Sequence, residues 1–205
     1  MIRLTLSLKI QRSRDLHDAC SVEGHPTRNA ENATRLTVAR AEVTAPGSLD
    51  AVVAGCDAVI SVVGTAYTRK PVTIYSDATR NIVHAMRAGG CKRLVVVSSG
   101  LTYPPTRSMG LFFDHVAKPL LRNVLGRTLY ADMRRMEEYL RNCDDIDWTV
   151  MRRARLTDEE TVSAYKVEPD GPSRHFTSRA DLAAAMLAEV HGKAHVHEAV
   201  APTTR

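Results

Sequence analysis

The sequence predicts a doubly wound α/β domain with a mostly parallel sheet, and three observations support this. Its 205 residues, of which 44% are apolar and 25% charged, suit one globular domain with a sizeable core. Apolar stretches at residues 57–64, 93–99 and 146–151 resemble buried strands. Helical patterns separate these stretches, and such βαβ units bring their strands together in parallel.

The remaining elements are expected in order along the chain. Residues 2–10 alternate apolar and polar side chains, which predicts a half-exposed strand. A short helix is expected at residues 14–20. Further strands are expected at residues 36–39, 161–167 and 198–201, and helices from Ser48, at 72–88, at 109–142 with a break near Gly126, and at 178–190 with Ser178 as N-cap.

Composition and charge exclude several classes of protein. No apolar run reaches the ~18 residues of a membrane span, and no secretory signal is evident, so we expect a soluble cytoplasmic protein without a membrane partner. The net charge is +5, but basic and acidic residues are interleaved and aromatics make up 5%, which argues against nucleic acid. The four cysteines lack metal-ligand spacing and are expected to be small buried side chains. We expect a monomer or homodimer.

In doubly wound sheets, ligands bind beyond the carboxyl ends of the strands. Five segments of the chain resemble the atypical short-chain dehydrogenase/reductase family with an NAD(P)H-binding domain, which includes NmrA-like proteins and the biliverdin reductase B/flavin reductase type. They are residues 55–64 (GCDAVISVVG), 79–86 (TRNIVHAM), 92–100 (KRLVVVSSG), 147–152 (DWTVMR) and 178–183 (SRADLA). The resemblance implies one Rossmann-like domain over residues 1–205, with a family-like core at 36–190 and a divergent, irregular segment at 1–35.

The family begins with a strand, a glycine-rich turn and a helix, and backbone N–H groups of the turn bind the pyrophosphate. Aligned on the helix expected at residues 14–20, the three glycine positions fall on Ser7, Ile10 and Ser13. None of the 11 glycines precedes Gly24, and isoleucine both resists positive φ and fills space that phosphate needs. Dinucleotide binding is therefore expected to depend on this altered turn. An altered or misassigned start of the gene is another explanation.

The resemblance implies further cofactor contacts. Arg28 matches the arginine that binds the 2′-phosphate of NADP. The alternative interpretation is that Arg28 is a solvated arginine in a loop. Glu42 and Val43 replace the family's Asp-Val beside the adenine. Gly64 and Thr65 match the loop along the ribose and phosphates, although glycine is also common at ordinary strand ends. NADP is therefore the expected cofactor, with NAD as the alternative.

Three side chains are candidates for catalysis. Ser98 and Ser99 end a strand at which related reductases place a serine that donates to a substrate carbonyl, and Ser98 is also a candidate cofactor contact. The alternative is a pair that caps the next turn. Tyr130, with Arg134 four residues later, resembles the Tyr/Lys acid of dehydrogenases, and its alternative is a packed helix residue. Arg153 stands where relatives have a proline beside the nicotinamide.

These features imply an NAD(P)H-dependent oxidoreductase. It would transfer hydride to a small-molecule acceptor, which we expect to be a flavin, a tetrapyrrole-like molecule or another carbonyl compound. The alternative is a protein without catalytic activity. It would be an NmrA-like dinucleotide sensor, or an interaction protein with a degenerate cofactor site.

Overall fold

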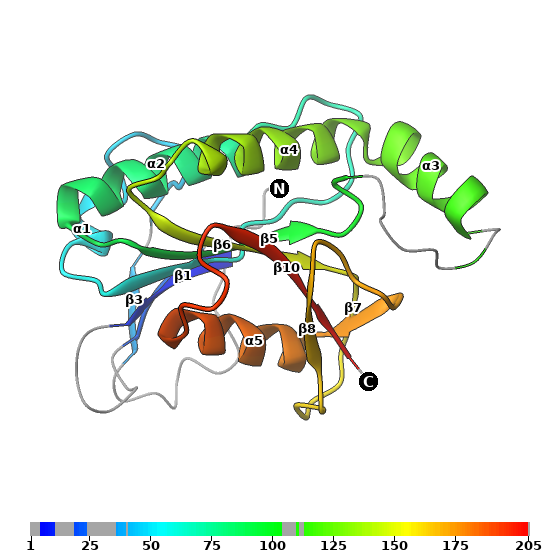
Figure 1. The fold of residues 1–205 in the computed structure, drawn as a ribbon. Helices are drawn as coiled ribbons and strands as arrows, with labels where there is room; N and C mark the ends of the chain where they lie inside the picture. Colours follow the sequence, from blue (N-terminus) through cyan, green and yellow to red (C-terminus); the bar gives the residue numbers. More distant parts are fainter. Residues whose placement is uncertain are drawn as a thin grey trace.

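The computed structural model describes residues 5–10, 19–23, 36–39, 41–103, 110 and 113–204. Its central feature is an eight-stranded sheet of order β3-β2-β1-β4-β5-β6-β10-β8 (Figure 1). The strands are β1 (Thr5–Ile10), β2 (Ala19–Glu23), β3 (Leu36–Ala39), β4 (Ala58–Ser61), β5 (Arg93–Ser99), β6 (Asp147–Arg153), β8 (Lys166–Pro169) and β10 (Glu198–Thr203). Two short strands, β7 (Arg155–Thr157) and β9 (Phe176–Ser178), pair in parallel as a second sheet.

Helices cover both faces of the large sheet, as the predicted Rossmann-like fold requires (Figure 1). α1 (Asp50–Val53), α2 (Ile74–Gly89) and α4 (Arg127–Arg141) lie on one face, and α5 (Arg179–His191) lies on the other. Before α4 the chain forms α3 (Lys118–Leu120) between two π-helical turns, η2 (Phe113–Ala117) and η3 (Leu121–Leu125). Within the described ranges, no helix is long and apolar enough to cross a membrane.

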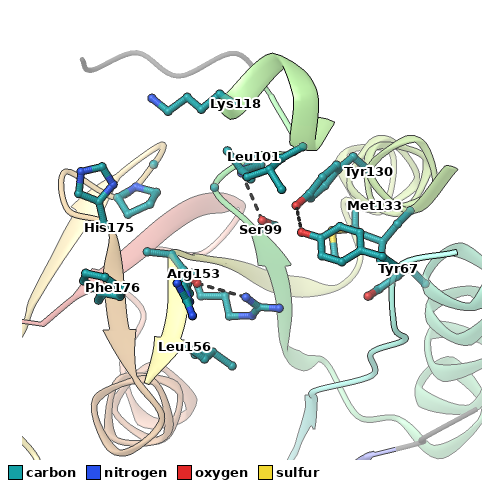
Figure 2. Close-up of a pocket in the computed structure, with 18 of the residues that line it drawn as sticks. Tyr67, Ser99, Leu101, Lys118, Tyr130, Met133, Arg153, Leu156, His175 and Phe176 are labelled. Carbon is teal, nitrogen blue, oxygen red and sulfur yellow. Dashed lines mark hydrogen bonds between the residues drawn. The ribbon is translucent and has the colours of Figure 1, made fainter. Parts of the chain in front are cut away.

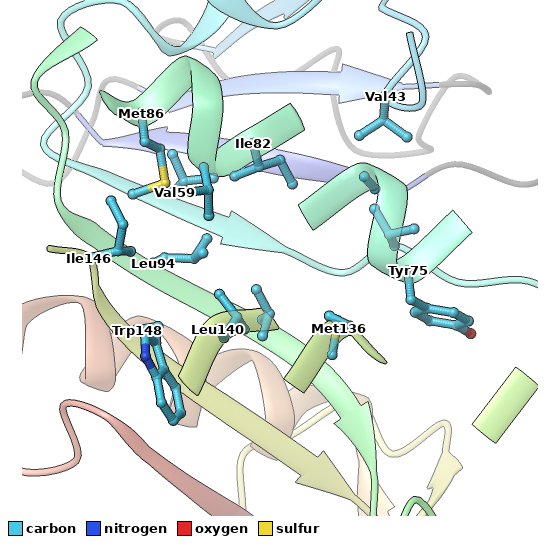
Figure 3. Close-up of a cluster of buried hydrophobic side chains, with 14 of the residues drawn as sticks. Val43, Val59, Tyr75, Ile82, Met86, Leu94, Met136, Leu140, Ile146 and Trp148 are labelled. Atoms are coloured by element: carbon cyan, nitrogen blue, oxygen red, sulfur yellow. The ribbon is translucent and has the colours of Figure 1, made fainter. Parts of the chain in front are cut away.

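The main core lies between the sheet and the α2–α4 pair (Figure 3). The spacing of apolar side chains along α2 explains why it packs here, because residues three or four apart share one helix face. Its stripe of Ile74, Ala78, Ile82, Ala85 and Met86 is fully buried, as predicted. The helix ends at Gly90, whose φ of 72° is a left-handed conformation that glycine adopts readily.

Several boundaries of the predicted elements are also confirmed. Gly126 separates η3 from α4, and the Ser178 hydroxyl caps α5 by accepting a hydrogen bond from Asp181 N at 2.9 Å. The strand expected at residues 161–167 is wrong, because pairing with β10 begins only at Lys166. β7 and β9 were not expected. The described cysteines Cys56, Cys91 and Cys143 are buried, as predicted.

The amino-terminal strand runs in the opposite direction to its neighbours. β1 pairs antiparallel with β4, with Ser7 opposite Ser61 and Ile10 opposite Ala58. Ser7 and Ile10 therefore lie within a strand rather than in a turn after it. Ile10 is level with the first residue of β4, at the edge of the sheet away from Gly64. The predicted strand-to-helix turn at these positions is thus corrected, and Ser13 lies outside the described residues.

The structure corrects the end of the short helix expected at residues 14–20, whose residues 14–18 lie outside the described residues. Ala19 and Cys20 belong to β2, which pairs antiparallel with β1 and parallel with β3. Hydrogen bonding to a strand on each side outweighs the local helical preference of this segment. Arg28 lies outside the described residues.

Candidate functional site

A cavity of about 570 Å³ lies at the carboxyl ends of β4, β5 and β6 (Figure 2). This is the edge of the sheet at which an α/β domain binds its ligands. Residues far apart in the sequence line it: Thr65, Tyr67, Tyr75, Ser99, Gly100, Leu101, Lys118, Leu121, Leu129, Tyr130, Met133, Arg153, Ala154, Arg155, Leu156, Gly171, Pro172, His175 and Phe176. The structure thus brings together four of the predicted site residues, namely Thr65, Ser99, Tyr130 and Arg153.

The two predicted serines at the end of β5 have different environments. Successive residues of a strand point to opposite sides, so only one of the pair faces the cavity. Ser99 lines the cavity, and its hydroxyl accepts a hydrogen bond from Leu101 N at 3.2 Å. Ser98 is fully buried and donates to Glu137 Oε1 at 2.7 Å. Ser99 is therefore the serine that can reach a bound molecule.

A buried ion pair fixes the strand ends behind the cavity. Glu137 and Arg152 are both buried, with Arg152 Nη2 donating to Glu137 Oε2 at 2.7 Å. Arg152 Nη1 also donates to the Asp170 carbonyl at 3.0 Å, and its guanidinium lies 4.6 Å from the ring centre of Tyr103. Because Arg152 pairs in register with Ser98, Glu137 holds β5 and β6 together.

Two phenols meet at one side of the cavity. The hydroxyl oxygens of Tyr130 and Tyr67 are 2.6 Å apart, and the two rings pack edge to face. Tyr130 is only 2% exposed, whereas Tyr67 is 55% exposed. Burial raises the pKa of Tyr130, the hydrogen bond with Tyr67 raises it further, and Ser99 and Arg153 act weakly in the opposite direction. Tyr130 is thus a protonated hydroxyl at neutral pH.

A third phenol fixes the loop that follows β4. Thr65 N donates a hydrogen bond to the Tyr75 hydroxyl at 3.3 Å. Burial raises the pKa of Tyr75, while the bond from Thr65 and the charge of Arg153 lower it. The backbone N–H of Thr65 is therefore held by the protein, and its side chain is left at the cavity wall. Gly64 precedes this position and does not line the cavity.

The charged residues of the cavity wall are all basic. They are Lys118, Arg153, Arg155 and His175, the last of which is cationic only when protonated. Arg153 is paired in register with Ser99, and Lys118 forms a buried ion pair with Asp114 at 2.5 Å. Among the residues that the structure describes, none that lines the cavity carries a carboxylate. The cavity therefore suits a neutral or anionic molecule.

Arg134, the expected cationic partner of Tyr130, lies elsewhere. Its guanidinium donates to the Thr102 carbonyl at 3.1 Å, and it does not line the cavity. Arg153 is the cation whose charge acts on Tyr130. The four-residue spacing along α4 suggested the wrong partner because β6, distant in sequence, delivers its last residue to the same place.

The predicted adenine contacts lie away from the cavity. Glu42 is exposed and accepts hydrogen bonds from Thr44 through its side chain, at 2.5 Å from Oγ1. Val43 is buried in the main core, and its carbonyl accepts from Asn81 Nδ2 at 2.9 Å. Val43 thus serves packing, and the carboxylate of Glu42 remains at the surface.

Sequence reasoning missed several residues of the cavity. Tyr67, Tyr75, Lys118, Leu156, His175 and Phe176 carry no family motif in the sequence. Gly126 is one sequence feature that relates to the pairing of Tyr67 with Tyr130. A Cβ built there would lie 2.7 Å from Tyr130 Cδ2 and 2.8 Å from Tyr67 Cε1, so the close packing of the two phenols requires glycine.

Comparison with known proteins agrees with this architecture. The sequence pattern of the NAD(P)H-binding family matches residues 17–193, most of the chain. The protein belongs to the NAD(P)H-binding family. The match includes the strand ends that contribute Thr65, Ser99 and Arg153 to the cavity.

Solved structures share the fold at low sequence identity. A candidate NADH-flavin reductase from Streptococcus pneumoniae is 16% identical with a TM-score of 0.69, over 91% of this chain and 87% of that one. An oxidoreductase from Lactococcus lactis is 16% identical with a TM-score of 0.67, over 87% and 78% of the two chains. A short-chain dehydrogenase/reductase from Veillonella parvula in complex with NADP is 19% identical with a TM-score of 0.62, over 84% and 74%. At these identities the similarity shows a common fold.

Proposed function

We propose that the protein is an NAD(P)H-dependent reductase that transfers hydride to a flat small-molecule acceptor in this cavity. The observation that carries the proposal is the meeting of two hydroxyls, Ser99 and Tyr130, with the cation of Arg153 at the carboxyl edge of the sheet. Membership of the NAD(P)H-binding family supports a nicotinamide dinucleotide as the hydride source.

The donor set of the cavity fits the nicotinamide end of such a cofactor. Its volume of about 570 Å³ is within the range of ligand pockets, and its charged wall residues are basic, which suits an anionic nucleotide. Thr65, Ser99 and Arg153 are the residues that would hold this end. The bound dinucleotide would supply a hydride, which the protein's own side chains cannot provide.

The cavity residues have separate tasks in this reaction. Ser99 donates a hydrogen bond to the carbonyl or ring heteroatom of the acceptor, which polarises it without adding charge. Tyr130 holds a proton for the same atom, and Arg153 stabilises the phenolate left behind. The apolar walls of Leu101 and Leu156 reduce the access of water to the reacting atoms.

We propose NADP as the preferred cofactor, with NAD as the alternative, and a flavin as the first acceptor to test before tetrapyrrole-like and other carbonyl compounds. The basic wall supports an acceptor that carries phosphate or carboxylate. We also propose a cytoplasmic monomer or homodimer.

The direction of β1 favours a second candidate. With Ser7 and Ile10 inside an antiparallel strand, neither occupies the turn that binds pyrophosphate in the family. A non-catalytic protein that senses a nucleotide, or uses the degenerate site to bind a partner, would tolerate this change. Such a protein would show no turnover with any acceptor.

The experiment is a titration with NADPH and NADH followed by nucleotide fluorescence, combined with turnover of FMN. Micromolar binding with turnover supports the reductase, binding without turnover supports the sensor, and no binding at millimolar nucleotide contradicts both nucleotide-binding functions.

Ser99→Ala should lower kcat/KM about 100-fold, since one preorganised donor is lost. Ser98→Ala is the matched control, because its hydroxyl faces Glu137, and it should retain wild-type turnover. Equal losses in the two variants would refute the assignment of Ser99.

A further inference from the structure

We propose that Tyr67 is a proton-relay residue that returns a proton from solvent to Tyr130 after each turnover. The inference rests on the proposed reductase function. It assigns a role in that reaction to a residue that no sequence motif marks. Tyr67 acts through Tyr130 and does not itself contact the reacting atoms.

The two hydroxyls form a path from the cavity to water. Their oxygens are 2.6 Å apart, within the distance of a good O–H···O hydrogen bond, and either can donate. In Figure 2 the two hydroxyls point toward one another beside Ser99. Because Tyr130 is 2% exposed and Tyr67 is 55% exposed, Tyr67 provides the contact with bulk water that Tyr130 lacks.

Contacts on both sides of Tyr67 hold it in this position. On one side, the Thr65 backbone is bonded to the hydroxyl of Tyr75 in α2. On the other, the Thr128 hydroxyl of α4 donates to the Thr68 carbonyl at 3.1 Å. The loop is thus tied to both helices.

Other groups of the cavity are poor proton sources for Tyr130. A guanidinium is not a proton donor to a phenolate in proteins, so Arg153 can stabilise the phenolate but cannot recharge it. Ser99 donates to the acceptor in the proposed reaction. His175 lies on the opposite side of the cavity (Figure 2), and the described part of the lining includes no carboxylate. The hydroxyls of Tyr67 and Ser99 both interact with Tyr130, and of these two residues Tyr67 is the exposed one.

The relay replaces the proton that each reduction takes from Tyr130. A bound dihydronicotinamide would supply the hydride, with the electron pair of its C–H bond, to the acceptor, so the nucleotide would be oxidised and the acceptor reduced. The acceptor heteroatom takes the proton from the Tyr130 O–H bond. Tyr130 then takes the proton of Tyr67, and Tyr67 takes one from water. One hydride and one solvent proton are consumed in each turnover.

The kinetic test is a cycle of Tyr67→Phe, Tyr130→Phe and the double variant. Tyr67→Phe should lower kcat about tenfold and raise its solvent deuterium isotope effect, because proton delivery becomes slower. KM and the dissociation constant of NADPH should stay unchanged. The double variant should be no slower than Tyr130→Phe, since Tyr67 acts only through Tyr130. Tyr139→Phe, the same change on α4 outside the cavity lining, is the control.

A second readout uses the protein without cofactor or acceptor. Incorporation of 3,5-difluorotyrosine lowers the pKa of every phenol, because fluorine stabilises the phenolate, and ¹⁹F NMR then follows each ring. Because the two hydroxyl oxygens are 2.6 Å apart and either can donate, Tyr67→Phe should shift the midpoint of the Tyr130 titration, and Tyr139→Phe should not. An unchanged midpoint would show that the phenols are not coupled in solution and would overturn the relay.

The outcomes separate this proposal from the reductase function. A wild-type protein that turns over FMN with an unaffected Tyr67→Phe variant overturns the relay alone. A loss from Tyr67→Phe that persists in the Tyr130→Phe background also overturns it, because the effect is then structural. If the wild-type protein binds no nucleotide and reduces no acceptor, the reductase function fails and the relay fails with it.

Discussion

Replacement of Glu137 by glutamine should strongly destabilise the protein. Glu137 is 1% exposed and accepts from Arg152 at 2.7 Å and from Ser98 at 2.7 Å. Glutamine keeps the size of the side chain but removes its charge, so the buried guanidinium loses its counter-ion. Breaking a buried ion pair in this way costs about 3–5 kcal/mol. We expect the lower end of this range, because Arg152 keeps its bond to the Asp170 carbonyl and its contact with Tyr103.

This loss is measured as the change in the free energy of unfolding in urea. Domains of this kind have a total stability of about 5–15 kcal/mol, so a loss of about 3 kcal/mol is readily resolved. The matched control is Asp145→Asn, which breaks an equally short pair with Arg87 at 2.7 Å whose side chains are about half exposed. Solvent screening makes such surface pairs weak, and the control should unfold close to wild type.

A third variant tests the cause of the loss. Glu137→Leu combined with Arg152→Met removes both charges and should be more stable than Glu137→Gln, since no unpaired buried charge remains. The reasoning is refuted if Glu137→Gln is no less stable than Asp145→Asn. It is also refuted if the double variant is the least stable of the set.

Three further predictions concern the cavity and the core. Gly126→Ala should cost about 1–3 kcal/mol of stability, because the added methyl group would overpack the phenol pair. Gly171→Ala is the control, since a Cβ there meets nothing within 4 Å and should cost little. Equal thermal unfolding of the two variants would contradict this. Asp132→Ala should cost about 1–3 kcal/mol, because its buried carboxylate accepts from the first backbone N–H groups of α2, at 2.8 Å in the shortest case, and an unchanged urea midpoint would disprove it. Burial raises the pKa of Cys91 to about 12, so this thiol should resist alkylation at pH 8 until the protein unfolds; rapid labelling of the native protein, followed by mass spectrometry, would count against it.

The sequence determined the class of fold because the periodicity of apolar and polar residues is a local property. Continuous apolar runs made β4, β5 and β6 recognisable, and the stripe of α2 with Gly90 after it gave that helix its face and its end. The strand ends also identified Thr65, Ser99 and Arg153 as residues of one edge. Parallel strands end at the same side of a sheet, so this inference needed no coordinates.

Only the tertiary structure decided the direction of β1 and the partners of the site residues. The alternating pattern of residues 5–10 suits a strand of either direction, and pairing with β4 makes it antiparallel. Likewise, Tyr130 meets Tyr67 and Arg153 because a loop, a helix and a strand end converge there. Such contacts depend on how distant elements pack, and sequence spacing along one helix could not reveal them. The sequence therefore defined the edge at which chemistry takes place, and packing defined which side chains meet there.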